Sequence, residues 1–270
     1  MGITPLAWAA AYGHEGVVKV LLSRDDIDPN KAGGDSETPL FLAACNGHER
    51  IVKILLGRED VNPDRPDGCG RTPLSLAACD GHEGVVKMLL GRDDVDPDTP
   101  DDDGETPLMW AIGNGHEEAV KMLLERDDVN PNKANENGET PLLWAVWNGH
   151  EGVVKLLLGR DDIDPDKPGR DGETPLLRAA RTGHEGVVKM LLGRDDVNPN
   201  KPDKGGRTPL WRAAYRGHKG VVKLLLAREE VNPNKPDGRG RTPRWWAAKN
   251  GHLGVIAVLQ RSRSATHSTA

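Results

Sequence analysis

The feature that most constrains this sequence is an internal repeat with a fixed period of 34 residues. The dipeptide Thr-Pro recurs with this step at residues 4, 38, 72, 106, 140, 174, 208 and 242, and Gly-His recurs with it from residue 13 to residue 251. A period of this length is typical of solenoids, in which each repeat packs against its neighbours. Positions within a repeat are numbered below by the residues of the first copy, 1–34.

Each copy carries the signals of two short helices. Thr4 suits the N-cap of a helix and Pro5 its first position, while Gly13 suits the left-handed residue that follows it. Positions 6, 9, 10 and 13 then share one face of this helix. A second helix is predicted over positions 15–23, with apolar positions 17, 18, 21 and 22, followed by a connector rich in Asp, Asn, Gly and Pro.

The stretch GETPLLWAVWNGHEGVVKLLL, residues 138–158, resembles the ankyrin repeat. Tetratricopeptide repeats have the same length, but their tryptophan and tyrosine pattern is missing here. The resemblance implies an all-α, ankyrin-repeat solenoid of eight helix-turn-helix units with β-hairpin-like fingers, in one domain over residues 1–260. Residues 261–270 are expected to be a disordered tail. The expected repeats are 1–34, 35–68, 69–102, 103–136, 137–170, 171–204, 205–238 and 239–260.

Three departures from the ankyrin pattern are visible. Position 7 lacks the usual histidine, acidic residues such as Asp25 replace the usual glycine after the second helix, and the connector is longer. We therefore expect slightly longer fingers. The near-identical copies, with segments such as RDDVNPNKPD, are similar to the ankyrin arrays of fungal NACHT-type sensor proteins, the counterparts of NOD-like receptors. This implies the sensor part of a larger receptor; a consensus-type designed scaffold is the alternative.

The two ends of the array differ. Arg244 and Gln260 replace apolar residues in the last copy, which predicts a polar C-terminal cap. The first copy keeps its apolar residues, so we expect an open N-terminal end, produced by a cut through a longer array or by a neighbouring domain. We expect a monomer, with end-to-end association at the N-terminal face as the alternative.

The copies differ mainly at positions 1, 3, 7, 8, 11, 12, 33 and 34. On a helical wheel, positions 8, 11 and 12 lie opposite the apolar face, and position 7 lies at its border. In ankyrin repeats this surface and the fingers form the concave binding groove, so the sequence keeps its scaffold and varies one surface. The predicted partner-binding residues are Trp8, Tyr12, Trp110, Trp144, Trp147, Arg178, Arg181, Trp211, Arg212, Tyr215, Arg216, Trp245, Trp246 and Lys249.

Charge is distributed unevenly along the chain. Residues 1–136 hold 13 Lys and Arg against 27 Asp and Glu, whereas residues 137–270 hold 23 against 15. This favours a protein partner with an acidic patch, bound to the second half. Trp110, Trp144 and Trp147 would anchor it, and the arginines would pair with carboxylates or phosphorylated groups. Alternatives are packing of these tryptophans between helices, nucleic-acid binding, which net charge −6 opposes, and a passive scaffold without a ligand.

Other chemistry finds little support in the sequence. Each repeat supplies one Gly-His histidine, and neighbouring copies should lie roughly 10 Å apart, too far to share a metal ion. These histidines are expected to be turn residues, and Cys45 and Cys79 to be free thiols. The acidic loops do not match a calcium-binding loop. The Arg24-Asp25-Asp26 run, which recurs in most copies, is expected to form a charge ladder between repeats.

The expected functional class is therefore binding rather than catalysis. The sequence shows no phosphate-binding glycine loop and no nucleophile with its base, so we expect no enzyme, no cofactor and no metal. No apolar stretch reaches the length of a membrane span, and the first residues lack a secretory signal. With few cysteines, these features favour a cytoplasmic, intracellular protein.

Overall fold

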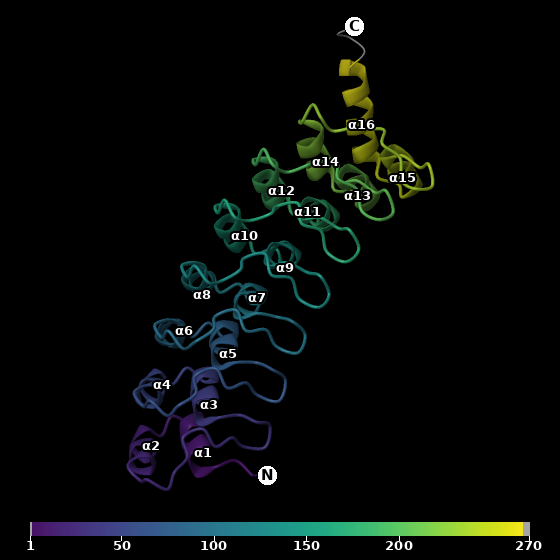
Figure 1. Ribbon diagram of the computed structural model, residues 1–270. Helices are drawn as coiled ribbons and strands as arrows, with labels where there is room; N and C mark the ends of the chain where they lie inside the picture. Colours follow the sequence, from purple (N-terminus) through teal and green to yellow (C-terminus); the bar gives the residue numbers. More distant parts are fainter. Residues whose placement is uncertain (1, 267–270) are drawn as a thin grey trace. The chain divides into compact units, whose positions relative to one another are not determined.

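The computed structural model describes residues 2–266, with side chains as far as residue 261, and the chain falls into two compact units. Unit 1 is Met1–Glu136 and unit 2 is Asn137–Ala270, so the division within the expected 1–260 domain lies at a repeat boundary. The described residues form helices joined by turns and loops and contain no strand, which confirms the all-α class (Figure 1).

Unit 1 consists of four helix-turn-helix repeats. Within it, the first helices of successive repeats pack side by side, and so do the second helices (Figure 1). The first helices are α1 (Pro5–Ala11), α3 (Pro39–Cys45), α5 (Pro73–Cys79) and α7 (Pro107–Gly113). The second helices are α2 (Glu15–Leu22), α4 (Glu49–Leu56), α6 (Glu83–Leu90) and α8 (Glu117–Leu124).

Unit 2 repeats this arrangement with four further pairs, again with first helices packed on first helices. The first helices are α9 (Pro141–Asn148), α11 (Pro175–Thr182), α13 (Pro209–Arg216) and α15 (Pro243–Lys249). The second helices are α10 (Glu151–Leu158), α12 (Glu185–Leu192), α14 (Lys219–Leu226) and α16 (Leu253–Thr266).

The predicted helix start is confirmed in every first helix. In α9 the Thr140 hydroxyl accepts a hydrogen bond from the Leu143 amide at 3.2 Å, and Pro141 occupies the first position. This satisfies one of the amides that a helix start leaves without a partner. Gly149 ends the helix with φ 72°, a left-handed conformation that glycine adopts without steric cost.

The core lies between the two layers of helices in each unit. Positions 6, 9 and 10 are buried throughout the first seven copies, and the alanine at position 9 in every copy allows close packing. Position 7, placed at the border from the sequence, is buried in the first seven repeats too, since first helices pack tightly against each other. In the first copy Val17 is 49% exposed, whereas the equivalent Ile51 is buried.

Arginines connect neighbouring second helices, but through backbone carbonyls, while the ion pairs of the recurring charged run lie within each repeat instead of forming the predicted ladder between repeats. Arg92 forms a two-bond pair with Asp94 and also donates from Nη1 to the Leu56 carbonyl at 2.7 Å, at the end of the preceding second helix. The last carbonyls of a helix lack intrahelical partners, so this bond satisfies one of them. The same contact recurs for Arg58, Arg126, Arg194 and Arg228.

The Gly-His histidines also join repeats. His82 donates from Nε2 to the Cys45 carbonyl of the preceding repeat at 2.9 Å, and His218 donates to the Arg181 carbonyl at 3.0 Å. These contacts confirm the structural turn role that the sequence predicts for them. They also hold position 11 of one repeat against the next turn.

The fingers are hairpin-like loops rather than strand pairs. The Asp67 amide donates to the Arg71 carbonyl at 3.0 Å across one finger, and the Gly68 amide donates to the Asp35 carbonyl of the preceding finger at 2.9 Å. No finger among the described residues forms a strand. Neighbouring fingers are thus tied by their own backbone, which gives the side chains at the finger base a defined position.

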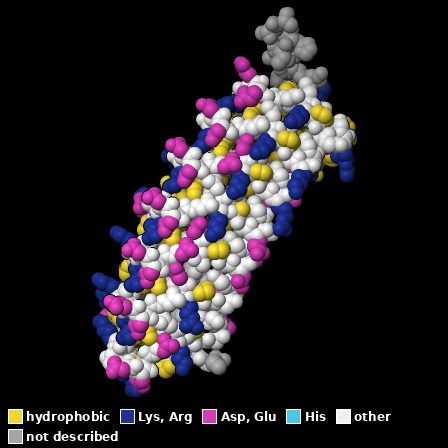
Figure 2. Space-filling model, in the orientation of Figure 1, with side chains coloured by type: hydrophobic (Ala, Val, Ile, Leu, Met, Phe, Trp, Pro, Cys, Tyr) yellow, Lys and Arg dark blue, Asp and Glu magenta, His cyan; other side chains and the backbone are white. Residues whose placement is uncertain are grey.

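The C-terminal end is helical further than expected. Helix α16 continues to Thr266, so residues 261–266 are helical where the sequence analysis expects a disordered tail, and residues 267–270 lie outside the described residues. Arg244 and Gln260 are exposed, as a polar cap requires. On the face of the molecule in Figure 2, charges of both signs are interspersed and hydrophobic side chains gather only in small patches.

Candidate functional site

A recurring contact ties position 8 of the first helix to the base of the preceding finger. The Trp110 indole donates to Asp101 Oδ2 at 2.9 Å, and the Trp246 indole donates to Asp237 Oδ2 at 3.1 Å. In both cases the acceptor lies nine residues earlier in the chain. The indole N–H is therefore used internally, and these half-buried tryptophans can offer a partner only part of their rings.

In unit 1 two of the three predicted residues form an exposed group. Trp8 and Tyr12 are exposed, with ring centroids 4.8 Å apart, and Trp8 lies 5.1 Å from the His14 ring. Trp110 is half-buried against its finger, as described above. Unit 1 thus presents aromatic surface at its first repeat.

The two tryptophans of α9 in unit 2 differ in environment. Trp144 is half-buried, which agrees with the packing alternative. Trp147 is 46% exposed, and the guanidinium groups of Arg178 and Arg181 lie 5.1 and 4.9 Å from its ring centre. Cations at this distance are attracted to the face of an indole. Trp147 is therefore held in position while much of its surface faces solvent.

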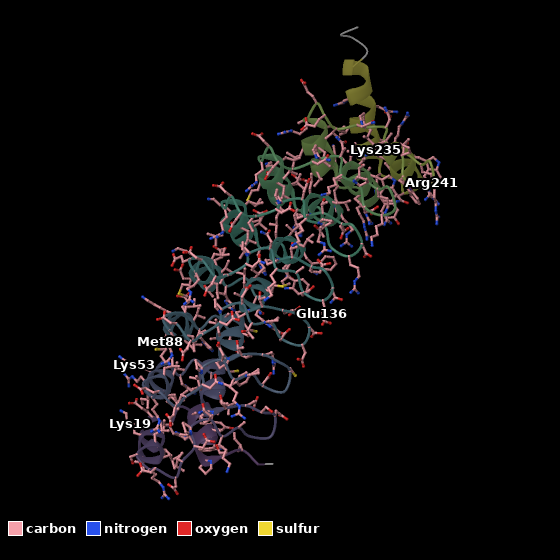
Figure 3. The ribbon with its side chains drawn as sticks, in the orientation of Figure 1. Lys19, Lys53, Met88, Glu136, Lys235 and Arg241 are labelled. Carbon is pink, nitrogen blue, oxygen red and sulfur yellow. The ribbon has the colours of Figure 1, made fainter. Side chains whose placement is uncertain are left out.

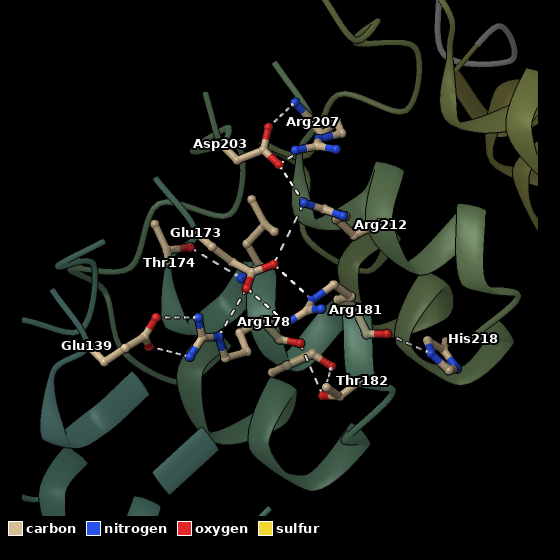
Figure 4. A network of polar contacts seen from close by, with 12 residues as sticks. Glu139, Glu173, Thr174, Arg178, Arg181, Thr182, Asp203, Arg207, Arg212 and His218 are labelled. Atoms are coloured by element: carbon tan, nitrogen blue, oxygen red, sulfur yellow. Dashed lines mark hydrogen bonds and ion pairs between the residues drawn. The ribbon is translucent and has the colours of Figure 1, made fainter. Parts of the chain in front are cut away.

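Arg178 lies at the centre of a buried network of ion pairs (Figure 4). Its side chain is paired through two nitrogens with Glu139 and through Nε with Glu173 at 3.1 Å, and the residue is only 7% exposed. Arg181 donates to the same Glu173 at 3.1 Å. Burial opposes the Arg178 charge, but hydrogen bonds and charge from Glu139 and Glu173 outweigh it and raise the pKa of the guanidinium.

The charge of the Arg212 guanidinium is less fully neutralised by nearby carboxylates. Its Nη2 donates to Asp203 at 2.8 Å and lies 3.8 Å from Glu173, while its buried Nε has no partner among the described residues. Burial, followed by repulsion from Arg207, lowers the pKa of this guanidinium. The surroundings of Arg212 therefore keep a positive potential that the protein only partly neutralises.

Three of the predicted partner-binding arginines form ion pairs within the protein. Arg178, Arg181 and Arg212 are engaged with its own carboxylates. Arg212 reaches the finger base nine residues earlier, as Trp110 and Trp246 do, whereas Glu139, at position 3, lies 39 residues before Arg178. Arg216 is exposed, and no ion pair is found for it among the described residues.

Next to Arg212, unit 2 contains a hollow of about 460 Å³ walled by aromatic rings. Trp211 and Tyr215 are stacked, with centroids 5.2 Å apart and planes 7° apart, and Trp246 meets both edge to face. Trp211 is 4% exposed, so it forms the floor rather than a contact surface. The lining residues are Gly205, Arg207, Trp211, Arg212, Tyr215, Arg216, Asp237, Arg239, Arg241 and Trp246.

A second hollow of about 510 Å³ adjoins the first and shares Arg207 and Arg212 with it. It contains the exposed Trp147 and the ion-pair network beneath it. Its lining residues are Trp147, Asp171, Glu173, Arg178, Arg181, Lys204, Arg207 and Arg212. Together the two hollows form one surface, which we call the unit 2 groove.

Trp245 and Lys249 line neither hollow, but both lie against Trp246, at 4.9 and 5.0 Å from its ring centre, and we include them in the unit 2 groove. Trp245 is 44% exposed, and the Lys249 ammonium lies 5.2 Å from its ring centre. Arg241, labelled in Figure 3, lies 4.4 Å from the Trp246 ring centre and pairs with Asp237 at 3.2 Å. Burial opposes the Asp237 charge, but hydrogen bonds from backbone amides, Trp246 and Arg241 outweigh it and lower its pKa to about 2.

In unit 1 two glutamates, Glu37 and Glu105, have a raised pKa in place of the ion pairs seen in unit 2. Burial and the charges of neighbouring aspartates raise the pKa of both groups, whose equivalents at position 3 in unit 2 are the ion-paired Glu139 and Glu173.

Cys45 and Cys79 are free thiols, as predicted. Burial, followed by the nearby Asp80, raises the pKa of Cys79 to about 11, so its thiolate is scarce at neutral pH.

Four carboxylates that organise the unit 2 groove were not predicted from the sequence, namely Glu139, Glu173, Asp203 and Asp237. One signal could have found two of them. Wherever position 3 of a repeat is arginine, position 33 of the preceding repeat is aspartate. The two residues are four positions apart and form an ion pair. The pairs are Asp67 with Arg71, Asp203 with Arg207 and Asp237 with Arg241.

Comparison with known proteins gives a family model described as ankyrin repeats (3 copies), which matches residues 6–101, 93–168, 127–203 and 176–268. No curated protein matches the chain. Within residues 2–266, no group of three or more potential ligands is placed to hold a metal ion. Among the described helices, none combines the length and the apolar character needed to cross a membrane.

Proposed function

This chain belongs to the ankyrin repeat family, and on that premise we propose that it binds a partner protein through the unit 2 groove. Ankyrin repeats are generally protein-interaction modules. The observation that carries the proposal is the pair of adjoining hollows, whose side chains lie at positions that differ between copies while the scaffold repeats. Surface apolar side chains that cluster around a hollow mark interaction sites.

Trp147 and Trp245 act as apolar anchors in this proposal. Each is nearly half exposed, and each is oriented by cations stacked on its ring, so little side-chain entropy is lost when a partner covers it. Arg216 and Lys249 then meet acidic groups of the partner. Arg178 and Arg181 hold Trp147 and the groove floor in place instead of contacting the partner.

Unit 1 contributes a second contact surface. Trp8 and Tyr12 present exposed rings, and Trp110 presents part of its indole. Because residues 1–136 carry 27 acidic against 13 basic side chains, this surface favours a part of the partner with positive charge.

We further propose that the array is the sensor part of a larger, intracellular receptor of the fungal NACHT type, and that this chain is a monomer. Near-identical copies support the first idea, because recombination between them would exchange groove residues without disturbing the core. Sequencing the transcript on both sides of the region that encodes residues 1–270 tests it. We expect the transcript to encode a neighbouring nucleotide-binding domain. A complete transcript that encodes no such domain would contradict this part of the proposal.

Site-specific photocrosslinking tests the groove directly. A photoreactive amino acid is placed at residue 147, 216 or 249 in the unit 2 groove, or at the exposed residue 189 or 223 on second helices α12 and α14. The control residues occupy the repeat position of Lys19 and Lys53, which project from the second helices of unit 1 (Figure 3). We expect one protein to be captured from all three groove positions and from neither control, whereas equal capture from both sets would contradict the proposal.

A further inference from the structure

We infer that the aromatic hollow of unit 2 is a recognition site for an aryl phosphate, in the form of a phosphotyrosine side chain of the partner. This inference rests on the proposed binding function and adds the chemistry of the recognised group. It concerns the hollow walled by Trp211, Tyr215 and Trp246, whose volume of about 460 Å³ suits one large side chain better than a folded surface.

The walls of the hollow suit a planar ring. Trp246 meets Tyr215 edge to face with centroids 5.1 Å apart, and Trp211 closes the floor beneath them. Aromatic rings pair in stacked or edge-to-face arrangements, each worth a measurable gain beyond area burial. A phosphoserine or glutamate side chain would add no ring contact to these walls.

The rim of the hollow suits a doubly charged anion. Five arginines line it, at residues 207, 212, 216, 239 and 241, against the single lining carboxylate Asp237. Asp203, just behind the wall, pairs with Arg207 and Arg212. A phosphate monoester carries nearly two negative charges at neutral pH, and guanidinium groups bind its oxygens through paired hydrogen bonds.

Two of these arginines are available to a ligand. Arg216 and Arg239 are exposed, and no ion pair is found for either among the described residues. The Arg216 guanidinium lies 5.8 Å from the Tyr215 ring centre, next to the aromatic wall. Arg212, a further lining residue, adds positive potential; burial and Arg207 depress its pKa, and an incoming anion would relieve the repulsion.

The charge of the hollow also separates this ligand from a nucleic acid. A single-stranded nucleic acid would need a basic track along its backbone, but the adjoining hollow contains Asp171 and Glu173 and its arginines are internally paired. Among the lining residues, the exposed cations without an ion pair are thus Arg216 and Arg239 in the first hollow and Lys204 alone in the second. A single phosphorylated side chain fits this distribution.

The test uses phenyl phosphate as the probe, because it contains the aryl ring and the phosphate without sequence context. Binding to the full chain is followed by NMR through the indole N–H signals, with Trp246 assigned by a Trp246→Phe variant. Inorganic phosphate, phenol and AMP are titrated in parallel. We expect phenyl phosphate to shift the Trp246 signal and to bind about tenfold or more tightly than phosphate or phenol, the ratio expected when ring and phosphate contacts add.

Variants locate the site. Arg216→Gln combined with Arg239→Gln should weaken phenyl phosphate binding about tenfold or more, because both available cations are lost. Lys189→Gln combined with Lys223→Gln removes the same charge from second helices α12 and α14 and should leave binding unchanged. Equal thermal melting of the two double variants shows that neither has lost its fold.

Several outcomes would overturn the inference. Equal affinity for inorganic phosphate and phenyl phosphate would reduce the hollow to a general anion site, and tighter binding of AMP would favour nucleotides. No binding, or binding that survives Arg216→Gln with Arg239→Gln, would remove the hollow as the site. If photocrosslinking at residue 147 still captures the partner in any of these cases, the phosphotyrosine assignment fails while the proposed binding function stands.

Discussion

At the scale of single residues, the position of a charge relative to its partners decides whether it supports the fold or faces solvent. Arg178 and Arg216 lie at positions 8 and 12 of successive repeats, one helical turn apart, but only Arg178 is buried between two glutamates. A buried cation is stable only when carboxylates match it, whereas an exposed one contributes little to folding. The same residue type therefore has opposite uses within one groove.

Replacing Arg178 by alanine should lower the free energy of unfolding by about 3 kcal/mol, because Glu139 and Glu173 would lose the cation between them. Arg216→Ala is the matched control and should change it by less than about 0.5 kcal/mol. Urea denaturation of both variants measures the difference. Equal denaturation midpoints would show that the network around Arg178 does not stabilise the protein.

Position 30 at the finger offers a second comparison between copies. The side-chain amide of Asn200 donates from Nδ2 to the Glu230 carbonyl of the next repeat at 2.6 Å. Asp166, at the same position, has a buried Oδ1 without a partner among the described residues. Asp166→Asn should therefore raise the free energy of unfolding by about 1 kcal/mol, the usual value of one added hydrogen bond. The reverse change, Asn200→Asp, should lower it, and two shifts of the same sign would contradict this explanation.

The benefit of Asp166→Asn should depend on pH. Burial raises the pKa of Asp166 in the folded state, so the folded protein binds a proton more tightly than the unfolded chain does. The cost of the buried carboxylate is therefore present at neutral pH and declines as the pH falls through the folded pKa towards the ordinary range of a carboxyl group. The difference in denaturation midpoint between wild type and variant should be smaller at pH 5 than at pH 7. A difference that stays the same at both pH values would exclude this cause.

At the scale of helices and fingers, arginines tie the end of one second helix to the next repeat. Arg194 donates to the Leu158 carbonyl at 2.8 Å and pairs with Asp196, whereas Arg24 in the first copy pairs with Asp26 without such a carbonyl contact. Arg194→Ala should therefore lower the free energy of unfolding by about 1 kcal/mol or more beyond the effect of Arg24→Ala, because it alone loses bonds to the preceding repeat, at the Leu158 and Arg160 carbonyls. Thermal unfolding of the two variants checks this, and equal losses would assign the stabilisation to the surface ion pair.

The helices could be predicted from the sequence because their signals are local. Thr140, Pro141 and Gly149 mark the start and end of α9 within ten residues, and the structure confirms each role. The pairing of Arg178 with Glu139 could not be predicted, since these residues are 39 positions apart and meet only when two repeats stack. The burial of Trp211 could not be predicted for the same reason. A helical wheel describes one helix alone, whereas position 7 is buried by packing between neighbouring first helices.

At the scale of the whole molecule, the two units differ in charge and in surface. Unit 1 is acidic and exposes aromatic and apolar side chains at its first repeat, including Tyr12, Val17 and Val20. Unit 2 is basic and contains both hollows of the groove. The repeat supplies the same scaffold to both units, and a few variable positions give each its own recognition chemistry.

The open first repeat should be visible in hydrogen exchange. Residues 1–34 are expected to exchange faster than residues 137–170, because Val17 and Val20 leave the second helix of the first repeat partly uncovered. Mass spectrometry of peptides from the two segments, after the same labelling times, provides the comparison. Equal protection of the two segments in the monomer would contradict the expectation.

The affinity of the photocrosslinked partner for groove variants tests the central claim most directly. Trp147→Ala and Trp245→Ala should each raise the dissociation constant about tenfold or more, as expected for exposed aromatic anchors, whereas Lys189→Ala on the second helix should leave it unchanged. Because unit 2 is basic, the association rate should also fall as salt is added. A dissociation constant that is the same for wild type, Trp147→Ala and Trp245→Ala would contradict the account.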